Sequence, residues 1–281
     1  MPNWLKTRFN DLKYFYWIAR NWRYLKGDKS SLIIFLIYWI LYPIPRLLFG
    51  RKRAHRILPT IISILKNKNF IIPLPIDKTN IYWIGIRDVI DFDVFREVCI
   101  EDHYNKSLLK PEMTIVDIGA HIGTFTLSAR KIIGERGRII AIEPEIMNFR
   151  QLKRNLKLNK INNCLIINVA LADHTGEEPF FLHKDSSGHS LIPGDSINKT
   201  QIKVKTLDDL LKELNISKVD FLKIDTEGVE LEVLKGGKET LCKNPKMKIV
   251  IDYSPGQETE IISYLKELNF FPKIFWGLIW I

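Results

Sequence analysis

Acidic residues follow several apolar, β-branched runs of this sequence, at points where a strand would end. Three of them are Asp117 in VDIGAHIGTFT, Glu143 in RIIAIEP and Asp173 in CLIINVALAD. Ligands of open α/β sheets bind at the carboxyl ends of parallel strands, so these acids are expected to meet at one site. Glu143 can accept both hydroxyls of a ribose, Asp173 can accept the exocyclic amine of adenine, and Asp117 suits a positively charged ligand. Each acid alone is equally well read as a helix cap or a solvated strand end.

The turn after Asp117 carries two glycines, Gly119 and Gly123, four residues apart. A dinucleotide fingerprint needs the spacing G-x-G-x-x-G, but His121 stands where the second glycine would be. The turn is therefore predicted to bind no pyrophosphate. S-adenosylmethionine, with its cationic ammonium and sulfonium groups, fits the acidic turn, and Gly119, His121 and Gly123 are predicted to lie against it.

A second group of acids, Asp225 and Glu227 in KIDTEG and Asp252 in KIVIDYS, follows two later apolar runs. Methyl transfer from a sulfonium to an alcohol needs an oriented hydroxyl and a proton acceptor. Asp225 is the predicted orienting or proton-accepting group, with Glu227 beside it. His189 in the SGHS loop is a further candidate base, because imidazole titrates near neutral pH. A divalent cation held by the three acids is an alternative, but spacing gives no ligand geometry and no metal ligand is assigned.

Apolar runs alternate with stretches of helical period from Met113 onward. The predicted strands are 114–120, 138–144, 164–173, 219–226 and 248–254, and the predicted helices are 123–134, 145–159, 229–243 and 257–268. This alternation predicts an α/β fold with a parallel sheet covered on both faces. The interval 174–206 departs from this alternation, with strand-like pieces at 180–183 and 202–205 on either side of a Ser/Gly-rich loop. This interval is predicted to form a lid or substrate wall. A further strand is predicted at 81–90.

These residues resemble the FkbM-type S-adenosylmethionine-dependent methyltransferases. The resemblance spans about residues 94–268 and is most specific in VDFLKIDTEGVELEVLKGG. It implies a class I methyltransferase, Rossmann-like sheet of seven strands with the last antiparallel, residues 271–281 supplying one terminal strand. It also implies methylation of a hydroxyl oxygen, usually on a sugar or natural product. Tyr104 matches a tyrosine of the family and is implied to cover the cofactor, whereas His121 stands where the family commonly has Asn.

The N-terminal fifth of the chain carries all of the net charge. Residues 1–60 hold 12 Lys+Arg and 2 Asp+Glu, and the rest of the chain holds 30 of each. Basic and aromatic residues interleave over 1–25, and the uncharged run 32–45 contains Pro43 and Pro45. A bilayer-spanning helix needs about 20 apolar residues, and both flanks of this shorter run are basic. Residues 1–56 are therefore predicted to bind the cytoplasmic membrane face peripherally or monotopically; a helix packed on protein and a true span are the alternatives.

The predicted organisation is a basic, aromatic-rich, helical and membrane-associated segment at 1–65, a connection at 66–110 and a methyltransferase domain at 111–281. Without net charge after residue 60, and without an Asn-Pro-Pro-Tyr-type motif, no nucleic-acid partner is expected. The predicted activity is O-methylation of a sugar, glycan or lipid-linked saccharide in the cytoplasm at the membrane face. The alternative is a catalytically silent scaffold that retains the cofactor.

The three cysteines are widely spaced and lie in apolar stretches, which predicts buried thiols in a reducing compartment without disulfides. They are Cys99, Cys164 and Cys242.

Overall fold

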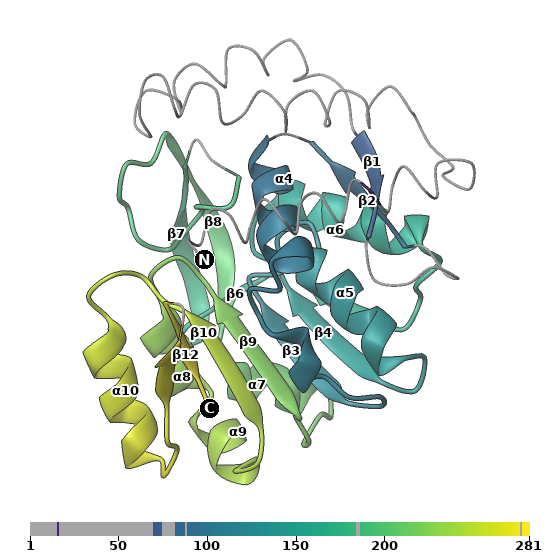
Figure 1. Ribbon diagram of the computed structural model, residues 1–281. Helices are drawn as coiled ribbons and strands as arrows, with labels where there is room; N and C mark the ends of the chain where they lie inside the picture. Colours follow the sequence, from purple (N-terminus) through teal and green to yellow (C-terminus); the bar gives the residue numbers. More distant parts are fainter. Residues whose placement is uncertain (1–15, 17–69, 75–81, 88, 184–185, 276) are drawn as a thin grey trace, which may run out of the picture. The chain divides into compact units, whose positions relative to one another are not determined.

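The computed structural model describes residues 16, 70–74, 82–87, 89–183, 186–275 and 277–281 (Figure 1). The predicted membrane-associated segment lies outside these residues except for Tyr16, whose side chain is exposed. Within the described residues, no helix has the length and hydropathy needed to cross a bilayer. The chain divides into two compact units, Met1–His103 and Tyr104–Ile281.

The described part of the first unit is a two-stranded antiparallel sheet followed by a helix. β1 (Phe70–Pro73) pairs with β2 (Trp83–Ile86), and α4 (Val89–Phe95) continues into a π-helix (Arg96–Ile100). The strand predicted at 81–90 is therefore too long. Asp91 ends it, because its buried carboxylate accepts the Arg87 backbone N–H and pairs with the Arg87 guanidinium at 2.8 Å, closing the turn into α4.

The second unit is built on a seven-stranded sheet. A 3-10 turn (Lys106–Leu108) precedes it. Its strands, in spatial order, are β11 (Lys273–Phe275), β12 (Leu278–Trp280), β10 (Lys248–Asp252), β9 (Phe221–Asp225), β3 (Thr114–Ile118), β4 (Arg138–Ile142) and β5 (Cys164–Ile167). β12 runs antiparallel to both of its neighbours, and β10, β9, β3, β4 and β5 are parallel to one another. The predicted class I methyltransferase sheet is confirmed, and residues 271–281 supply two strands of it as a hairpin.

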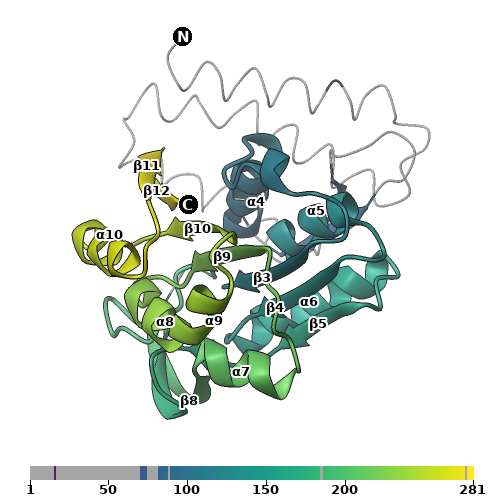
Figure 2. The same cartoon turned by 90° about the horizontal axis from the view of Figure 1, so that it is seen from below.

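Helices cover both faces of this sheet. They are α5 (Thr124–Ile133), α6 (Ile146–Leu158), α7 (Leu207–Glu213), α8 (Glu230–Gly236), α9 (Lys238–Lys243) and α10 (Glu258–Glu267). Figure 2 shows α7, α8 and α9 on one side of the strands and α5 on the other. Leu222 and Ile224 of β9 belong to the core shared with α7–α10. Because side chains alternate along a strand, Phe221, Lys223 and Asp225 face the α5 side, where Phe125 stacks on Phe221.

Two predicted elements are each divided in the structure. The helix predicted at 229–243 becomes α8 and α9, which meet at Gly236–Gly237. A Cβ on Gly236 would lie 2.1 Å from the carbonyl oxygen of Ala172. The close approach of that backbone explains the glycine.

The strand predicted at 164–173 belongs to two different sheets. β5 ends at Ile167, where the Asn168 amide donates to the carbonyl oxygens of Glu143 and Pro144 at 2.9 and 2.8 Å. The chain then enters a three-stranded sheet formed by β6 (Ala170–Leu171), β8 (Asn198–Lys205) and β7 (Gly176–Leu182). β6 is parallel to β8 and β7 antiparallel to it, so the interval 174–206 forms a long hairpin rather than two short strand-like pieces.

All three cysteines are free thiols. Cys99 is buried and Cys164 half-buried, but Cys242 is exposed, so its predicted burial is wrong. It lies in the last turn of α9, away from the buried positions of that helix, Thr240 and Leu241.

Candidate active site

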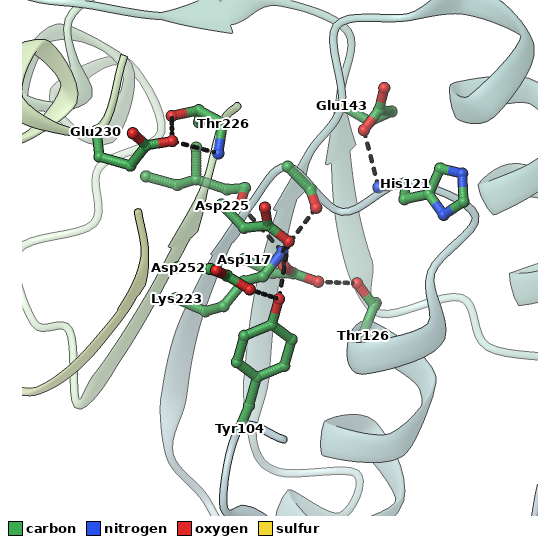
Figure 3. A network of polar contacts seen from close by, with 12 residues as sticks. Tyr104, Asp117, His121, Thr126, Glu143, Lys223, Asp225, Thr226, Glu230 and Asp252 are labelled. Atoms are coloured by element: carbon green, nitrogen blue, oxygen red, sulfur yellow. Dashed lines mark hydrogen bonds and ion pairs between the residues drawn. The ribbon is translucent and has the colours of Figure 1, made fainter. Parts of the chain in front are cut away.

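Charged side chains meet at the carboxyl ends of the three central strands of the sheet (Figure 3). Asp117 of β3 lies opposite Lys223 of β9, and Asp225 lies opposite Asp252 of β10 in the strand register. Carboxylates of β3, β9 and β10 thus lie together, whereas the sequence had grouped Asp117 with Glu143 and Asp173.

Asp117 is fully buried, and its carboxylate contacts other side chains of the protein. Its Oδ2 accepts the Thr126 hydroxyl at 2.5 Å, and its Oδ1 lies 3.3 Å from Lys223 Nζ. Asp117 was predicted to face a cationic ligand, but in the structure Lys223 supplies the positive charge. A lysine inside the apolar run VDFLKID was the available signal, because a buried ammonium needs a buried counter-charge.

Asp225 is only partly buried, with 29% of its side chain exposed. Its Oδ2 accepts the Tyr104 hydroxyl at 2.8 Å and lies 3.3 Å from Lys223 Nζ. Among the described residues, the hydrogen bonds and ion pairs of this carboxylate all use Oδ2. Oδ1 therefore remains for an external hydrogen-bond donor.

Tyr104 is buried and its hydroxyl joins two carboxylates. The same oxygen lies 3.4 Å from Asp252 Oδ2, and the ring packs edge-on against Phe125. Burial, reinforced by the charges of Asp225 and Asp252, raises the pKa of Tyr104 well above its ordinary value. The phenol thus stays protonated and acts as a donor. Its implied contact with a cofactor stays a prediction.

Glu227 occupies the turn between β9 and α8 in a left-handed conformation, with φ of 58°. Burial of the carboxyl and, as a smaller effect, repulsion from Asp225 and Asp252 raise the pKa of Glu227 to about 8. Strained non-glycine backbone of this kind costs about 1–3 kcal/mol and clusters at functional sites. Glu230 holds the same turn, because one of its carboxylate oxygens accepts the N–H groups of Thr226 and Gly228 at 3.2 and 2.9 Å.

The glycine loop after β3 touches the backbone of β9. Gly119 has φ of 74°, and a Cβ there would lie 1.7 Å from the carbonyl oxygen of Asp225. The N–H groups of Gly119 and Ala120 both donate to the carbonyl of Ile142 in β4 at 3.0 Å. Gly123, with φ of 90°, caps the start of α5. The loop is therefore fixed between β4 and β9.

Glu143 anchors the other end of this loop. Its buried carboxylate accepts the backbone N–H groups of His121 and Glu145 at 2.8 and 2.9 Å, and the Asn148 amide at 3.4 Å. Burial raises the pKa of Glu143 despite these donors. His121 itself has φ of 51°. The structure thus joins Glu143 and His121, two residues that the sequence assigned to one cofactor.

Two predicted site residues belong to the three-stranded sheet and its hairpin loop. Asp173 follows β6 in the three-stranded sheet, is exposed and lies 3.0 Å from His174, so its predicted place at the end of a main-sheet strand is wrong. His189 accepts the His183 backbone N–H through Nδ1 at 3.0 Å and packs edge-on to Phe180. Its role as a base stays a prediction.

The hairpin loop reaches the site through a residue that the sequence did not single out. Ser190 is buried, and its hydroxyl donates to the carbonyl oxygen of Glu227 at 2.7 Å. Ile192 lies against Gly228, because a Cβ added to this glycine would be only 2.6 Å from Ile192 Cδ1. The 186–197 part of the loop therefore packs against the Glu227 turn.

No group of three or more His, Cys, Asp or Glu residues is placed to bind a metal ion in the described part of the chain.

Residues 117–272 match the family model of the methyltransferase FkbM domain, which covers more than half of the chain. The chain belongs to the FkbM methyltransferase family. This confirms the family that its motifs indicated.

Relatives of this FkbM methyltransferase are identical to it at about a quarter of the aligned positions. It is 26% identical to methyltransferase sdnD of Sordaria araneosa over an alignment of 210 residues, which covers 63% of this chain and 81% of that one. It is also 26% identical to the 2-O-methyltransferase NoeI of Sinorhizobium fredii over an alignment of 155 residues, which covers 48% of this chain and 62% of NoeI. A crystal structure of methyltransferase FkbM from Methylobacillus flagellatus matches 60% of this chain and 46% of its own, with 21% identity and a TM-score of 0.40. The chain thus spans less than two thirds of the length of the last two proteins.

Proposed function

We propose that this FkbM methyltransferase transfers a methyl group from S-adenosylmethionine to a hydroxyl oxygen. One observation carries the proposal. The glycine loop after β3 and the carboxylate-bearing end of β9 are in direct backbone contact at Gly119 and Asp225. A cofactor against the loop and an acceptor on Asp225 Oδ1 would therefore be neighbours, and proximity is the main requirement of a displacement reaction.

The residues present suit this cofactor. A side chain at position 119 would clash with the Asp225 carbonyl oxygen, so only glycine allows the loop to lie this close to the end of β9. The Glu143 carboxylate accepts three hydrogen bonds in the structure, and a carboxylate offers about four acceptor sites, so it can accept one ribose hydroxyl and not the two that the sequence predicted. Gly119, His121, Gly123 and Glu143 would hold the nucleoside. When bound, S-adenosylmethionine supplies a methyl group already activated by a sulfonium.

Glu143→Gln should weaken S-adenosylmethionine binding by about ten- to a hundred-fold, since a hydrogen bond to a charged group is worth about 1.5–3 kcal/mol. Titration calorimetry measures this change. Glu145→Gln is the matched control, because Glu145 caps α6 by accepting the Asn148 N–H at 2.6 Å and should affect stability more than affinity. Equal affinity of Glu143→Gln and the wild type would show that the ribose assignment is wrong.

Asp225 and Glu227 have different roles in the proposed reaction. Tyr104 and Lys223 hold Oδ2 of Asp225, which suits this carboxylate to orient the acceptor hydroxyl through Oδ1. Glu227 has the raised pKa, about 8, which suits it to take the hydroxyl proton. A general base works best when its pKa lies near the working pH.

This assignment sets the sign of the pH dependence. Below its raised pKa of about 8, Glu227 is largely protonated and unable to accept a proton, so kcat/KM should rise with pH and level off above about 8. Glu227→Gln should lower the plateau and abolish the rise. Glu239→Gln, at an exposed position on α9, should keep the wild-type profile. A wild-type profile in Glu227→Gln would remove Glu227 from the reaction.

The acceptor we propose is a hydroxyl of a sugar, glycan or lipid-linked saccharide at the cytoplasmic membrane face. The name of the relative NoeI, a 2-O-methyltransferase, supports oxygen as the methylated atom. The basic and aromatic residues 1–56 support the membrane location. In cell fractionation the full chain should sediment with membranes at low salt, and recovery in the soluble fraction without detergent would contradict the location.

Mass spectrometry of cell-envelope glycans and lipids tests the proposed activity. Cells that contain the protein should carry a species heavier by one CH₂ unit than its counterpart in cells that lack the protein. Identical spectra would contradict methylation of an envelope saccharide.

A further inference from the structure

Lys223 is a buried ammonium at the centre of the candidate site. Only 3% of its side chain is exposed, and Nζ lies 3.3 Å from a carboxylate oxygen of both Asp117 and Asp225. It also donates to the carbonyl oxygens of Ile118 and Gly119 at 3.2 and 2.7 Å. Lys223 thus contacts the acceptor-side carboxylate and the glycine loop at the same time.

The lysine remains charged in this environment. Burial by itself would lower its pKa, but the charges of Asp225 and Asp117 outweigh this effect and raise it. Its Nζ also lies 5.3 Å from the ring centroid of Tyr104, a further favourable contact for a cation. Lys223 therefore acts as a fixed positive charge, not as a proton acceptor.

Stability alone does not account for a buried ion pair at this place. The cost of removing both charges from water offsets most of their attraction, and apolar replacements are often as stable. The two carboxylates bound by Lys223 also differ in environment. Asp117 is fully buried and anchored by Thr126, whereas Asp225 opens to solvent. The lysine therefore connects a rigid anchor to the carboxylate that is available to an acceptor.

We propose that Lys223 is a positioning residue for methyl transfer, which fixes the Asp225 carboxylate relative to the Gly119 loop. This inference rests on the proposed function. Tyr104 and Lys223 hold Asp225 Oδ2 from two directions, and loss of one of them lets the carboxylate rotate. The glycine loop keeps its other contacts, the bonds to Ile142 and the bond from His121 to Glu143. Removal of Lys223 should thus disturb Asp225 more than the cofactor loop.

The experiment removes the charge without leaving a buried carboxylate unpaired. Lys223→Met alone should lower the melting temperature, because it leaves Asp117 buried without its counter-charge. The double variant Asp117→Asn with Lys223→Met removes both charges and should regain most of that loss. Lys223→Arg keeps the charge, although its guanidinium has a different geometry.

Three quantities are measured for each variant: the melting temperature, the calorimetric Kd for S-adenosylmethionine, and, as a function of pH, the rate of labelled-methyl transfer to an envelope extract from cells that lack the protein. We expect the double variant to bind S-adenosylmethionine within a few-fold of wild type but to show kcat about 100-fold lower, as for a misplacement of about 1 Å. Its pH profile should also move to higher pH, because Lys223 lowers the pKa of Glu227 in the wild type. Lys223→Arg should keep the wild-type pH midpoint.

Two results would overturn the role of Lys223. If the double variant regains melting temperature, kcat and pH profile together, Lys223 only neutralises Asp117. If kcat falls no more than affinity does, Lys223 serves the cofactor site and not Asp225. Absence of transfer by the wild type itself would contradict the proposed function instead, so the two failures are distinguishable.

Discussion

Asp225→Asn should lower kcat by about 10²-fold, as expected for loss of acceptor orientation, and leave the Kd for S-adenosylmethionine within a few-fold. The asparagine keeps the size of the side chain and an oxygen for the Tyr104 hydroxyl, but it loses the anionic oxygen proposed to orient the acceptor. Asp225 is partly exposed, so its neutralisation should leave the fold intact. Single-turnover transfer of labelled methyl, with calorimetry in parallel, separates the two effects.

Asp220→Asn is the matched control for Asp225→Asn. Asp220 lies at the amino end of the same strand, where it accepts the Thr114 N–H at 2.9 Å and pairs with Lys218 at 2.8 Å. Its substitution should change melting temperature and leave kcat unaltered. Normal turnover by Asp225→Asn would exclude Asp225 from the mechanism. Absence of turnover by the wild type itself would instead favour a silent cofactor-binding protein.

Gly119→Ala should abolish measurable S-adenosylmethionine binding and destabilise the fold by roughly 3 kcal/mol, the sum of overpacking and left-handed strain. The new Cβ would lie 1.7 Å from the Asp225 carbonyl oxygen. The alanine Cβ is fixed by the backbone and its partner is a backbone oxygen, so no side-chain rotation relieves the clash. Either the glycine loop or the end of β9 must move, and each movement separates cofactor and acceptor. Thermal unfolding and calorimetry measure the two losses.

Gly277→Ala isolates the conformational part of this effect. Gly277 has φ of 78°, close to that of Gly119, but a Cβ there would meet no atom of the described residues within 4 Å. Its substitution should lower the free energy of unfolding by about 1 kcal/mol, as expected for a left-handed non-glycine residue, and leave the affinity for S-adenosylmethionine unchanged. Wild-type affinity in Gly119→Ala would contradict the placement of the cofactor against this loop.

The main sheet was predictable because its strands are continuous apolar runs. β3, β4, β9 and β10 are each covered on both faces, so their composition alone marks them, and alternation with helices makes them parallel. The break between β5 and β6 was not predictable from hydropathy. The run 164–173 is apolar throughout, and the turn depends on two hydrogen bonds from Asn168 to the segment after β4.

In the candidate site, too, features marked by local sequence were predictable and features that depend on distant contacts were not. The positions of Glu143, Asp225 and Glu227 at strand ends were predictable, because the apolar runs before them mark the strands. Asp173 was misplaced together with its strand. The contacts of Lys223 and Ser190 were not predicted, because they join residues 104 and 37 positions apart in sequence. Such contacts leave no local pattern, although a charged residue inside an apolar run is a usable sign.

Titration of the purified full-length chain with S-adenosylmethionine tests the central claim most directly. We expect saturable heat with one site per chain, and weaker binding by Glu143→Gln. A wild-type chain that is folded by circular dichroism and releases no heat would contradict the methyl-donor site at the ends of β3 and β4.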